Sequence, residues 1–432
     1  MDRQALRQDF ERVRAVSMRL AAPLQPEDWR VQSMPDVSPP YWNLGHTSWF
    51  FARNVLRPLG RDCGDFPGFD YAFNSYYEGL GPRLSRDRRG RVAQPGTAAT
   101  LEYRRAVDAA VVAAIGDCAG EQFAALARGI GIGLQHEQQH QELLLTEILH
   151  IRWSAPSDLR LPYAAAIPAG EPAEPGPLRA LDVAGGVVEI GHDGPGFCWD
   201  NELPRHRRVA TDLALADRLV TNGEWLQFVA DGGYDDPLLW LSNGWAAVQQ
   251  HGWRAPLYWH RQDGAWTRFT LRGAVAVDPA APVGHVSFYE AEAFARWYGL
   301  QFSGWRHARL PAEHEWEHAA RTLGFATGHA NLLDDEPARS ALDVRRALPG
   351  TGARQLAGDV WEWTSSHYEP YPGYRPFDGA LMEYNGKFMD NQRVLRGGSF
   401  ATPRTHARVA YRNFWPAATR FQAAGVRLLL DR

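Results

Sequence analysis

The sequence predicts a multi-domain protein of mixed class, in which an N-terminal four-helix bundle is followed by an α+β domain rich in loops. Three observations carry this prediction. Apolar side chains recur at helical spacing through residues 1–160, five prolines interrupt any period in 161–180, and short β-like runs alternate with Gly-, Pro- and Trp-rich loops in 181–432. The 432 residues suffice for two to three domains. We therefore expect two domains joined by a semi-rigid linker at 161–180.

The first domain is expected to hold four helices. Leu6, Phe10, Val13, Val16 and Leu20 form a single apolar stripe on the first of them. Asn43, after a Pro-Pro pair, and Thr100 are the expected N-caps of the second and third helices. The expected helices cover residues 2–20, 43–56, 100–115 and 122–153.

The second domain is expected to contain short elements only. Strands are predicted at 185–190 and within 394–400. Ser287 and Glu290 have the spacing of a capping box at the start of one helix. The expected helices are limited to residues 221–230, 287–298 and 312–322.

Composition excludes several classes of protein. Lys plus Arg total 46 and Asp plus Glu total 50, and a net charge of −4 supplies no basic field for nucleic acid. No stretch reaches 18 apolar residues and the N-terminus lacks an apolar signal core, so we expect no membrane partner and a cytoplasmic location. Three widely spaced cysteines exclude a disulfide framework and a four-cysteine zinc site.

The segment GLQHEQQHQELLLTEILH, residues 133–150, carries the densest chemical signal. On a helix His136 and His140 lie on one face and can bind one metal ion. Two such histidines can also form a hydrated face, but the apolar periodicity on both sides argues against that. Glu142, Glu147 and His150 are candidates for hydrogen-bond support of the ligands.

A third ligand is needed, and two sources are considered. His136 to His140 also fits HExxH, the zinc-peptidase pattern in which the glutamate is the general base. A peptidase needs its third ligand downstream, where only Trp153 and the proline-rich linker follow. His46, within PYWNLGHTSWFF, is the more plausible third ligand. Three imidazoles suit Fe, Cu, Ni and Zn alike.

His46 with His136-x-x-x-His140-x-Glu142 resembles the DinB-like, iron-binding domain of the ergothioneine-type sulfoxide synthases. The second half is similar to the formylglycine-generating-enzyme-like domain, a C-type-lectin-related fold. Its markers are RLPAEHEWEHAAR, GDVWEWTSS, VLRGGSF and the closing GVRL. The two resemblances cover nearly the whole chain in the order of the two-domain family.

The resemblance implies a mononuclear Fe(II) held by three histidines, dioxygen as oxidant, and hercynine as the substrate that gains a carbon–chalcogen bond at imidazole C2. It assigns Gln139 and Asn413 to the hercynine end of the site. Aromatic faces hold quaternary ammonium groups, and Tyr384, Phe414 and Trp415 are candidates for this role. No cysteine follows residue 198, so formylglycine generation is not expected.

The reaction also needs a proton donor, for which a positioned tyrosine is suitable. One branch of the family places this tyrosine three residues before the equivalent of Tyr384, where this chain has Leu381. Another branch carries a tyrosine pair in the first domain, and this chain has Tyr76 and Tyr77. We expect this pair to be catalytic.

The second substrate is the least constrained. Thiol donors of the family, cysteine and γ-glutamylcysteine, carry carboxylates that need arginine partners, here Arg83, Arg86 or Arg420. Trp415 stands where the γ-glutamylcysteine branch has Asp, and Phe421 replaces Trp, which removes a polar anchor. The selenoneine synthases resemble the same scaffold and take a selenosugar.

We therefore expect carbon–selenium bond formation from a selenosugar, with carbon–sulfur bond formation from cysteine or γ-glutamylcysteine as the alternative. Two readings from other classes remain. One is an HExxH zinc hydrolase, and the other is a binding module in which the lectin-like half recognises a sugar or peptide.

Overall fold

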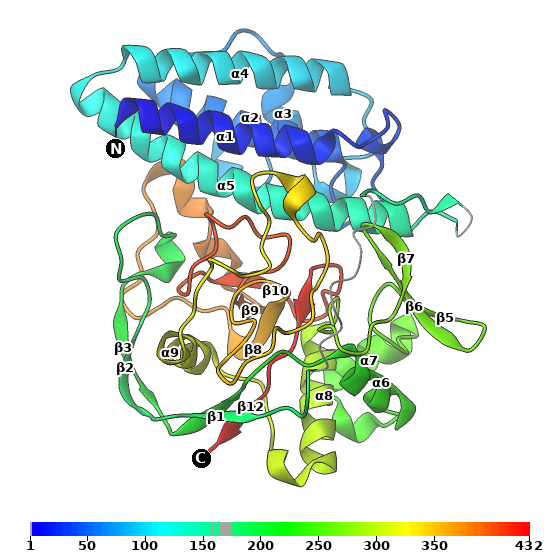
Figure 1. Ribbon diagram of the computed structural model, residues 1–432. Coiled ribbons are helices and arrows are strands. Elements are labelled where there is room, and N and C mark those ends of the chain that lie inside the picture. The colour runs from blue at the N-terminus through cyan, green and yellow to red at the C-terminus, as the bar shows by residue number, and fades with distance from the viewer. Residues whose placement is uncertain (1, 157–158, 165–174) are drawn as a thin grey trace. The chain divides into compact units, whose positions relative to one another are not determined.

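The computed structural model describes residues 2–156, 159–164 and 175–432, and the chain divides into two compact units (Figure 1). The helical unit comprises residues 1–164, 334–339 and 377–384, and the mixed unit comprises the rest. Two short segments of the expected second domain thus belong to the helical unit. Residues 165–174 of the expected linker lie outside the described residues. A helical bundle and an α+β unit confirm the expected fold class.

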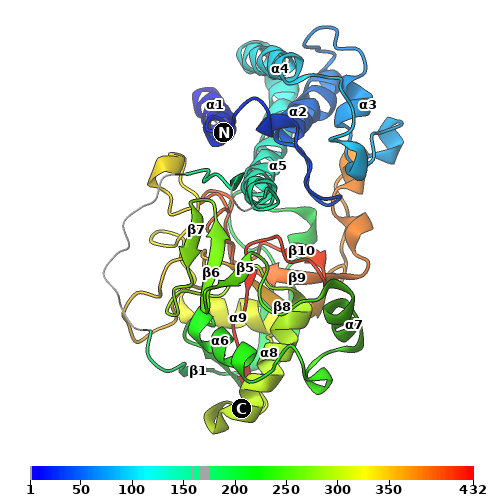
Figure 2. The ribbon, with the colours of Figure 1, turned by 90° about the vertical axis from the view of Figure 1, so that its right-hand side faces the viewer.

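The helical unit is built on four long helices, which Figure 2 shows nearly end-on. Helix α2 packs on α4 and α5, and α1 packs mainly on α5. The predicted apolar stripe of α1 is fully buried. The helices are α1 (Arg3–Ala21), α2 (Pro40–Phe51), α4 (Thr97–Asp117) and α5 (Gly120–Trp153), with a short α3 (Phe69–Phe73).

Two predicted caps are wrong because each helix begins three residues earlier. Helix α2 starts at Pro40, whose missing N–H and fixed φ suit the first helical position, so Asn43 lies inside the helix. Helix α4 starts at Thr97, and the hydroxyl of Thr100 donates to the carbonyl of Gly96 from within the first turn. Every side chain of α2 is buried, so Asn43 and His46 both lie in the interior of the unit.

A buried ion cluster joins three of the long helices. Glu137 on α5 accepts hydrogen bonds from Arg14 on α1 at 2.7 Å and from Arg104 on α4 at 2.6 Å. Ser17 donates to the same carboxylate at 2.6 Å. Burial alone would raise the pKa of Glu137, but the two guanidinium groups hold that pKa below its ordinary value. The cluster therefore fixes an anion in the core of the bundle.

In the described part of the mixed unit the strands form four small sheets. The central sheet has the order β10-β9-β8-β11, and β11 runs parallel to β8 while the other pairs are antiparallel. The other sheets are β1-β4-β12, β2-β3 and β5-β6-β7. The strands are β1 (Ala180–Val183), β2 (Gly186–Ile190), β3 (His206–Ala210), β4 (Leu213–Ala216), β5 (Trp259–Gln262), β6 (Ala265–Thr270), β7 (Gly273–Ala276), β8 (Trp361–His367), β9 (Gln392–Arg396), β10 (Asn413–Pro416), β11 (Ala424–Gly425) and β12 (Leu429–Asp431).

Among residues 175–432 of this unit the structure has four α-helices, one more than expected. The capping box of Ser287 and Glu290 is confirmed. Helix α7 was not predicted because its N-cap, Leu241, makes no side-chain cap; its end is marked by Gly252 with φ +62°. The helices are α6 (Asn222–Ala230), α7 (Ser242–His251), α8 (Phe288–Gln301) and α9 (Glu313–Leu323).

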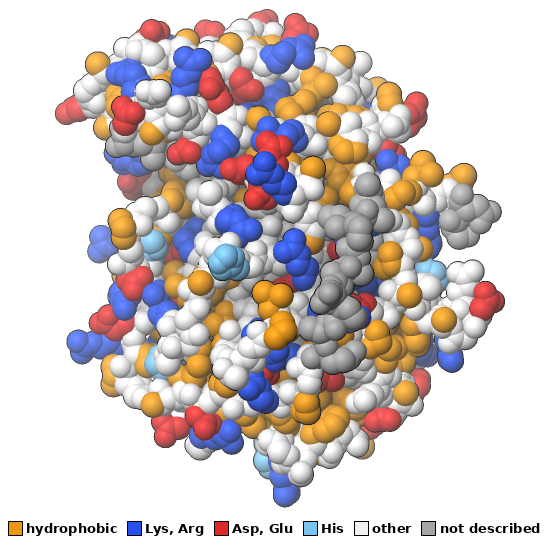
Figure 3. Space-filling model, in the orientation of Figure 1, with side chains coloured by type: hydrophobic (Ala, Val, Ile, Leu, Met, Phe, Trp, Pro, Cys, Tyr) orange, Lys and Arg blue, Asp and Glu red, His pale blue; other side chains and the backbone are white. Residues whose placement is uncertain are grey.

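Surface and helix composition add two findings. Within the described ranges, no helix combines the length and apolar character needed to cross a membrane. Acidic and basic side chains are interspersed on the face that Figure 3 shows.

We predict that Glu137→Gln lowers the free energy of unfolding by about 3–5 kcal/mol, because it leaves two buried guanidinium groups without their carboxylate. Urea denaturation followed by circular dichroism measures this loss. The pKa of Glu137 is lowered in the folded protein, so the stabilisation by its carboxylate is present at neutral pH. This stabilisation is lost as the pH falls through the pKa of the folded state. Glu102→Gln on the exposed face of α4 is the control. Equal stability of the two variants would contradict the prediction.

Candidate metal centre

Three histidine side chains converge inside the helical unit. His46 comes from α2, and His136 and His140 come from α5. One ring nitrogen from each lies within 4.8 Å of the other two, and the Nε2 atoms of His46 and His136 are 3.2 Å apart. The helical spacing of four places both α5 imidazoles on the face that meets α2. The structure therefore brings together the three predicted ligands.

Hydrogen bonds orient two of the rings. His46 Nδ1 donates to the carbonyl of Phe73 at 2.7 Å. His140 Nδ1 donates to Asn43 Oδ1 at 2.8 Å, and the amide nitrogen of Asn43 donates to Glu147 at 2.5 Å. With Nδ1 protonated, each ring presents the lone pair of Nε2 to the centre.

The charge state of the histidines suits metal binding. Burial lowers the pKa of His136 to about 3, and burial together with the neighbouring imidazoles lowers the pKa of His46 and His140 well below the ordinary value. Neutral imidazoles are the form that binds metal ions.

The spacing of the nitrogens also suits a metal ion. Two nitrogens held about 2.1 Å from one metal ion at right angles lie about 3.0 Å apart, close to the 3.2 Å between His46 and His136. The donor set therefore fits a metal ion bound by three histidines on one side, with the other positions open.

Aromatic rings enclose the ligands. Trp42 stacks on His46 with ring centroids 4.6 Å apart and planes 12° from parallel. Trp49 stacks on the same imidazole at 5.7 Å, and Phe50 contacts His136 at 4.5 Å. These contacts restrict ring rotation and exclude water from the nitrogens, which is the cause of the pKa depression.

The glutamate of the HExxH pattern does not face the histidines as a free base. Its carboxylate is held by Arg14, Arg104 and Ser17 in the core cluster and is fully buried. A zinc peptidase needs this group at the metal-bound water. The geometry therefore gives Glu137 a structural role.

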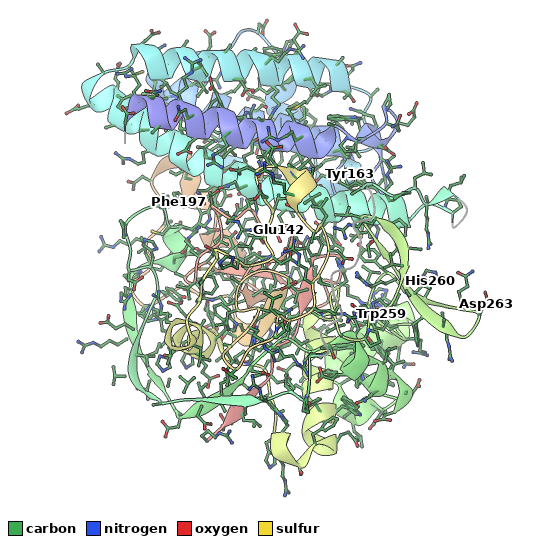
Figure 4. All side chains as sticks on the ribbon, in the orientation of Figure 1. Glu142, Tyr163, Phe197, Trp259, His260 and Asp263 are labelled. Atoms are coloured by element: carbon green, nitrogen blue, oxygen red, sulfur yellow. The ribbon has the colours of Figure 1, made fainter. Side chains whose placement is uncertain are left out.

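Three further residues were predicted to support the ligands. Glu147 does so through Asn43, and also accepts from the backbone N–H of Ser38 at 2.8 Å. Burial raises the pKa of Glu147 to about 7. His150 pairs with the Ser33 hydroxyl at 2.7 Å. Glu142 is buried on α5 (Figure 4).

A tyrosine pair and a third tyrosine lie beside the centre. The ring of Tyr384 stands perpendicular to His136 at 5.6 Å, and its hydroxyl donates to Gln139. Tyr76 lies 6.2 Å from Tyr384 and stacks on Tyr77 at 4.7 Å. Tyr77 is fully buried, and burial raises its pKa well above the ordinary value. Tyr76 is therefore the member of the pair that reaches the ring beside His136.

Arginines near the pair differ in their partners. Arg83 donates to Glu78 at 2.7 Å, and both side chains are partly exposed. Arg86 is exposed. Arg89, which was not predicted, is buried with its guanidinium 3.3 Å over the ring of Trp42. Several arginines lie close together in this part of the sequence, and nothing in the sequence distinguishes Arg89 as the buried one.

The remaining predicted residues lie in the mixed unit. Asn413, Phe414 and Trp415 form β10, and Phe414 stacks on Tyr368 at 4.0 Å. Trp415 meets Phe421 edge to face at 5.3 Å.

Arg420 is already engaged within the mixed unit. Its guanidinium donates to Glu290 at 3.0 Å, and also to the carbonyl of Ala255. The same group lies 4.4 Å over the ring of Trp253. The charge of Arg420 is therefore already paired with a carboxylate of the protein.

Comparisons with known families divide the chain in the same order. Residues 9–144 match the DinB superfamily, and residues 170–432 match the sulfatase-modifying factor enzyme 1-like domain. The second match covers more than half of the chain.

Curated relatives extend over both parts. A hercynine oxygenase of Mycolicibacterium smegmatis is 36% identical over 69% of this chain and 70% of its own. A hercynine oxygenase of Mycobacterium tuberculosis is 33% identical over 92% of both chains. Ergothioneine biosynthesis protein 1 of Schizosaccharomyces pombe is 27% identical over 54% of this chain and 27% of its own. With a three-histidine centre in its DinB domain, this chain is an enzyme that belongs to the hercynine oxygenase family.

Proposed function

We propose that this enzyme joins the imidazole C2 of hercynine to the selenium of a selenosugar, using non-heme Fe(II) and dioxygen. The buried three-histidine centre is the observation that carries the proposal. The hercynine part is supported by relatives named hercynine oxygenase, one of which is similar over 92% of both chains. The centre lies in the helical unit, whose residues 9–144 match the DinB superfamily.

His46, His136 and His140 would hold the iron through Nε2. Bound Fe(II) would supply the chemistry that activates dioxygen, because protein side chains do not activate dioxygen by themselves. The protein supplies neutral ligands, fixed ring orientations and a dry aromatic wall. Positions opposite the three histidines stay open for substrates.

Gln139 and Tyr384 would bind the imidazole end of hercynine beside His136. Their mutual hydrogen bond fixes both groups before substrate arrives. The hydroxyl of Tyr76 would be the proton donor that the reaction needs. Tyr76 contacts Tyr384, the ring beside His136, whereas Tyr77 is fully buried. The family resemblance also assigns hercynine binding to Asn413, and we propose substrate binding for Phe414 and Trp415 on β10 as well.

The choice of donor is supported by the ion pairs of the predicted arginines and by the aromatic rings at Trp415. Arg420 is paired with Glu290 and Arg83 with Glu78, so two of the three predicted partners of a donor carboxylate already have a carboxylate of the protein. Aromatic rings such as Trp415 and Phe421 suit a sugar, which stacks on their faces. The alternative is a carbon–sulfur bond with cysteine or γ-glutamylcysteine, and it is favoured by the 33–36% identity to hercynine oxygenases.

We expect His136→Ala to lose both iron binding and turnover, since two imidazoles remain for an ion that needs three. Metal analysis after anaerobic reconstitution with Fe(II) measures the first, and product formation from hercynine in air measures the second. His251→Ala, at the exposed end of α7, is the matched control. Turnover by metal-free His136→Ala would refute the proposal.

Asn43→Leu is expected to weaken Fe(II) binding about 10- to 100-fold, because His140 loses the acceptor that fixes its ring. Competition with a chromophoric chelator gives the affinity. Asn54→Leu is the control, because the amide nitrogen of Asn54 has no hydrogen-bond partner among the residues that the structure describes. Equal affinities of the two variants would show that Asn43 does not orient the ligand.

A competition among donors decides between selenium and sulfur. The reconstituted enzyme receives hercynine, air, a 1-selenosugar, cysteine and γ-glutamylcysteine in one reaction, and mass spectrometry identifies the adducts. A selenium-bearing hercynine adduct is the expected product. A cysteinyl sulfoxide adduct would instead establish the alternative and remove the argument from Trp415.

A further inference from the structure

The turn that follows the tyrosine pair is held by a single carboxylate from a distant part of the sequence. Glu383 accepts hydrogen bonds from the backbone N–H groups of Glu78 at 3.1 Å and Gly79 at 3.0 Å, one on each oxygen. The turn η4 (Glu78–Leu80) begins directly after Tyr77. In Figure 2 the orange turn that ends at Glu383 lies beside this blue loop.

The two segments are closely fitted. A Cβ atom on Gly79 would lie 3.1 Å from a carboxylate oxygen of Glu383, so the contact requires glycine or a shift of the carboxylate. The first N–H groups of a helical turn have no partner within the turn. An ionised acceptor makes stronger hydrogen bonds to them than a neutral one. Glu383 therefore acts as a clamp on η4.

The next residue links the clamp to the metal centre. Tyr384 contacts His136 at 5.6 Å and Tyr76 at 6.2 Å, and its hydroxyl donates to Gln139. Glu383 thus holds η4, and the next residue, Tyr384, contacts His136 on α5. The separation between Tyr76 and Tyr384 depends on both contacts.

Tyr77 has a support of its own. Asn74 accepts from the N–H of Tyr77 at 3.0 Å and donates to its carbonyl at 2.9 Å. Tyr77 also packs against Trp49, with ring centroids 5.6 Å apart. Loss of the clamp would leave Tyr77 in place but release Glu78, whose N–H also donates to the carbonyl of Tyr76 at 3.0 Å. The orientation of Tyr76 toward Tyr384 would then change.

We propose that Glu383 is a positioning residue, which holds Tyr76 at a fixed distance from the metal centre. The inference rests on the proposed function, in which the Tyr76 hydroxyl supplies a proton. It adds a residue that neither the histidine motif nor the tyrosine pair points to. Glu383 acts on the reaction only through the placement of Tyr76.

Fluorine NMR of the Co(II)-loaded enzyme containing 3-fluorotyrosine tests the placement without turnover. The Tyr76 signal is identified by its loss in Tyr76→Phe. We expect Co(II) to shift this signal in the wild type, and Glu383→Ala to reduce the shift at least twofold, with Glu383→Gln between the two. Asp378→Ala, an exposed change in the same segment, is the control. An unchanged Tyr76 signal in Glu383→Ala overturns the proposal.

Kinetics with the Fe(II) enzyme test the consequence. Glu383→Ala should lower kcat about 10-fold while Fe(II) affinity and the KM for hercynine stay within twofold. In the Tyr76→Phe background the same change should have no further effect on kcat. A drop in kcat that persists in that background overturns the proposal. Wild-type enzyme without turnover on any donor would refute the proposed function, and the fluorine signal would still decide the role of Glu383.

Discussion

The helical unit depends on one buried anion. Glu137 projects from α5 toward α1 and α4, where it is neutralised by Arg14 and Arg104. Since a helix is rigid about its axis, this attachment fixes the rotation of α5 and therefore directs the residues on either side of Glu137. His136 and His140 consequently face α2, where His46 lies. A charge in the core thus determines which face of α5 presents the two histidines to His46.

The surroundings of the three histidines explain why their side chains stay neutral. Glu137 is paired with Arg14 and Arg104, while the histidines are lined by Trp42, Trp49 and Phe50. An apolar enclosure keeps the imidazoles neutral. Hydrogen bonds that His140 donates to Asn43 and His46 donates to the Phe73 carbonyl then fix the ring orientations that burial alone would leave free.

Much of this was predictable from the sequence, and the rest was not for physical reasons. The long helices follow from apolar periodicity, and His46, His136 and His140 follow from spacing and setting. The predicted start of α2 is wrong because the helix begins with proline at its first position and not after a polar cap. That error hid Asn43, whose role depends on being inside the helix. Glu383 and Arg89 could not be predicted, because their contacts join segments far apart in the chain.

The assignment of residues 377–384 to the helical unit has a consequence for how such enzymes can be recombined. A chimera that joins the first 160 residues to another C-terminal domain would carry all three histidines. The residues at the positions of Tyr384, which contacts His136, and of Glu383, which holds the turn after the tyrosine pair, would come from the other parent. Exchange of substrate specificity by domain shuffling therefore has to transfer this eight-residue insertion together with the bundle.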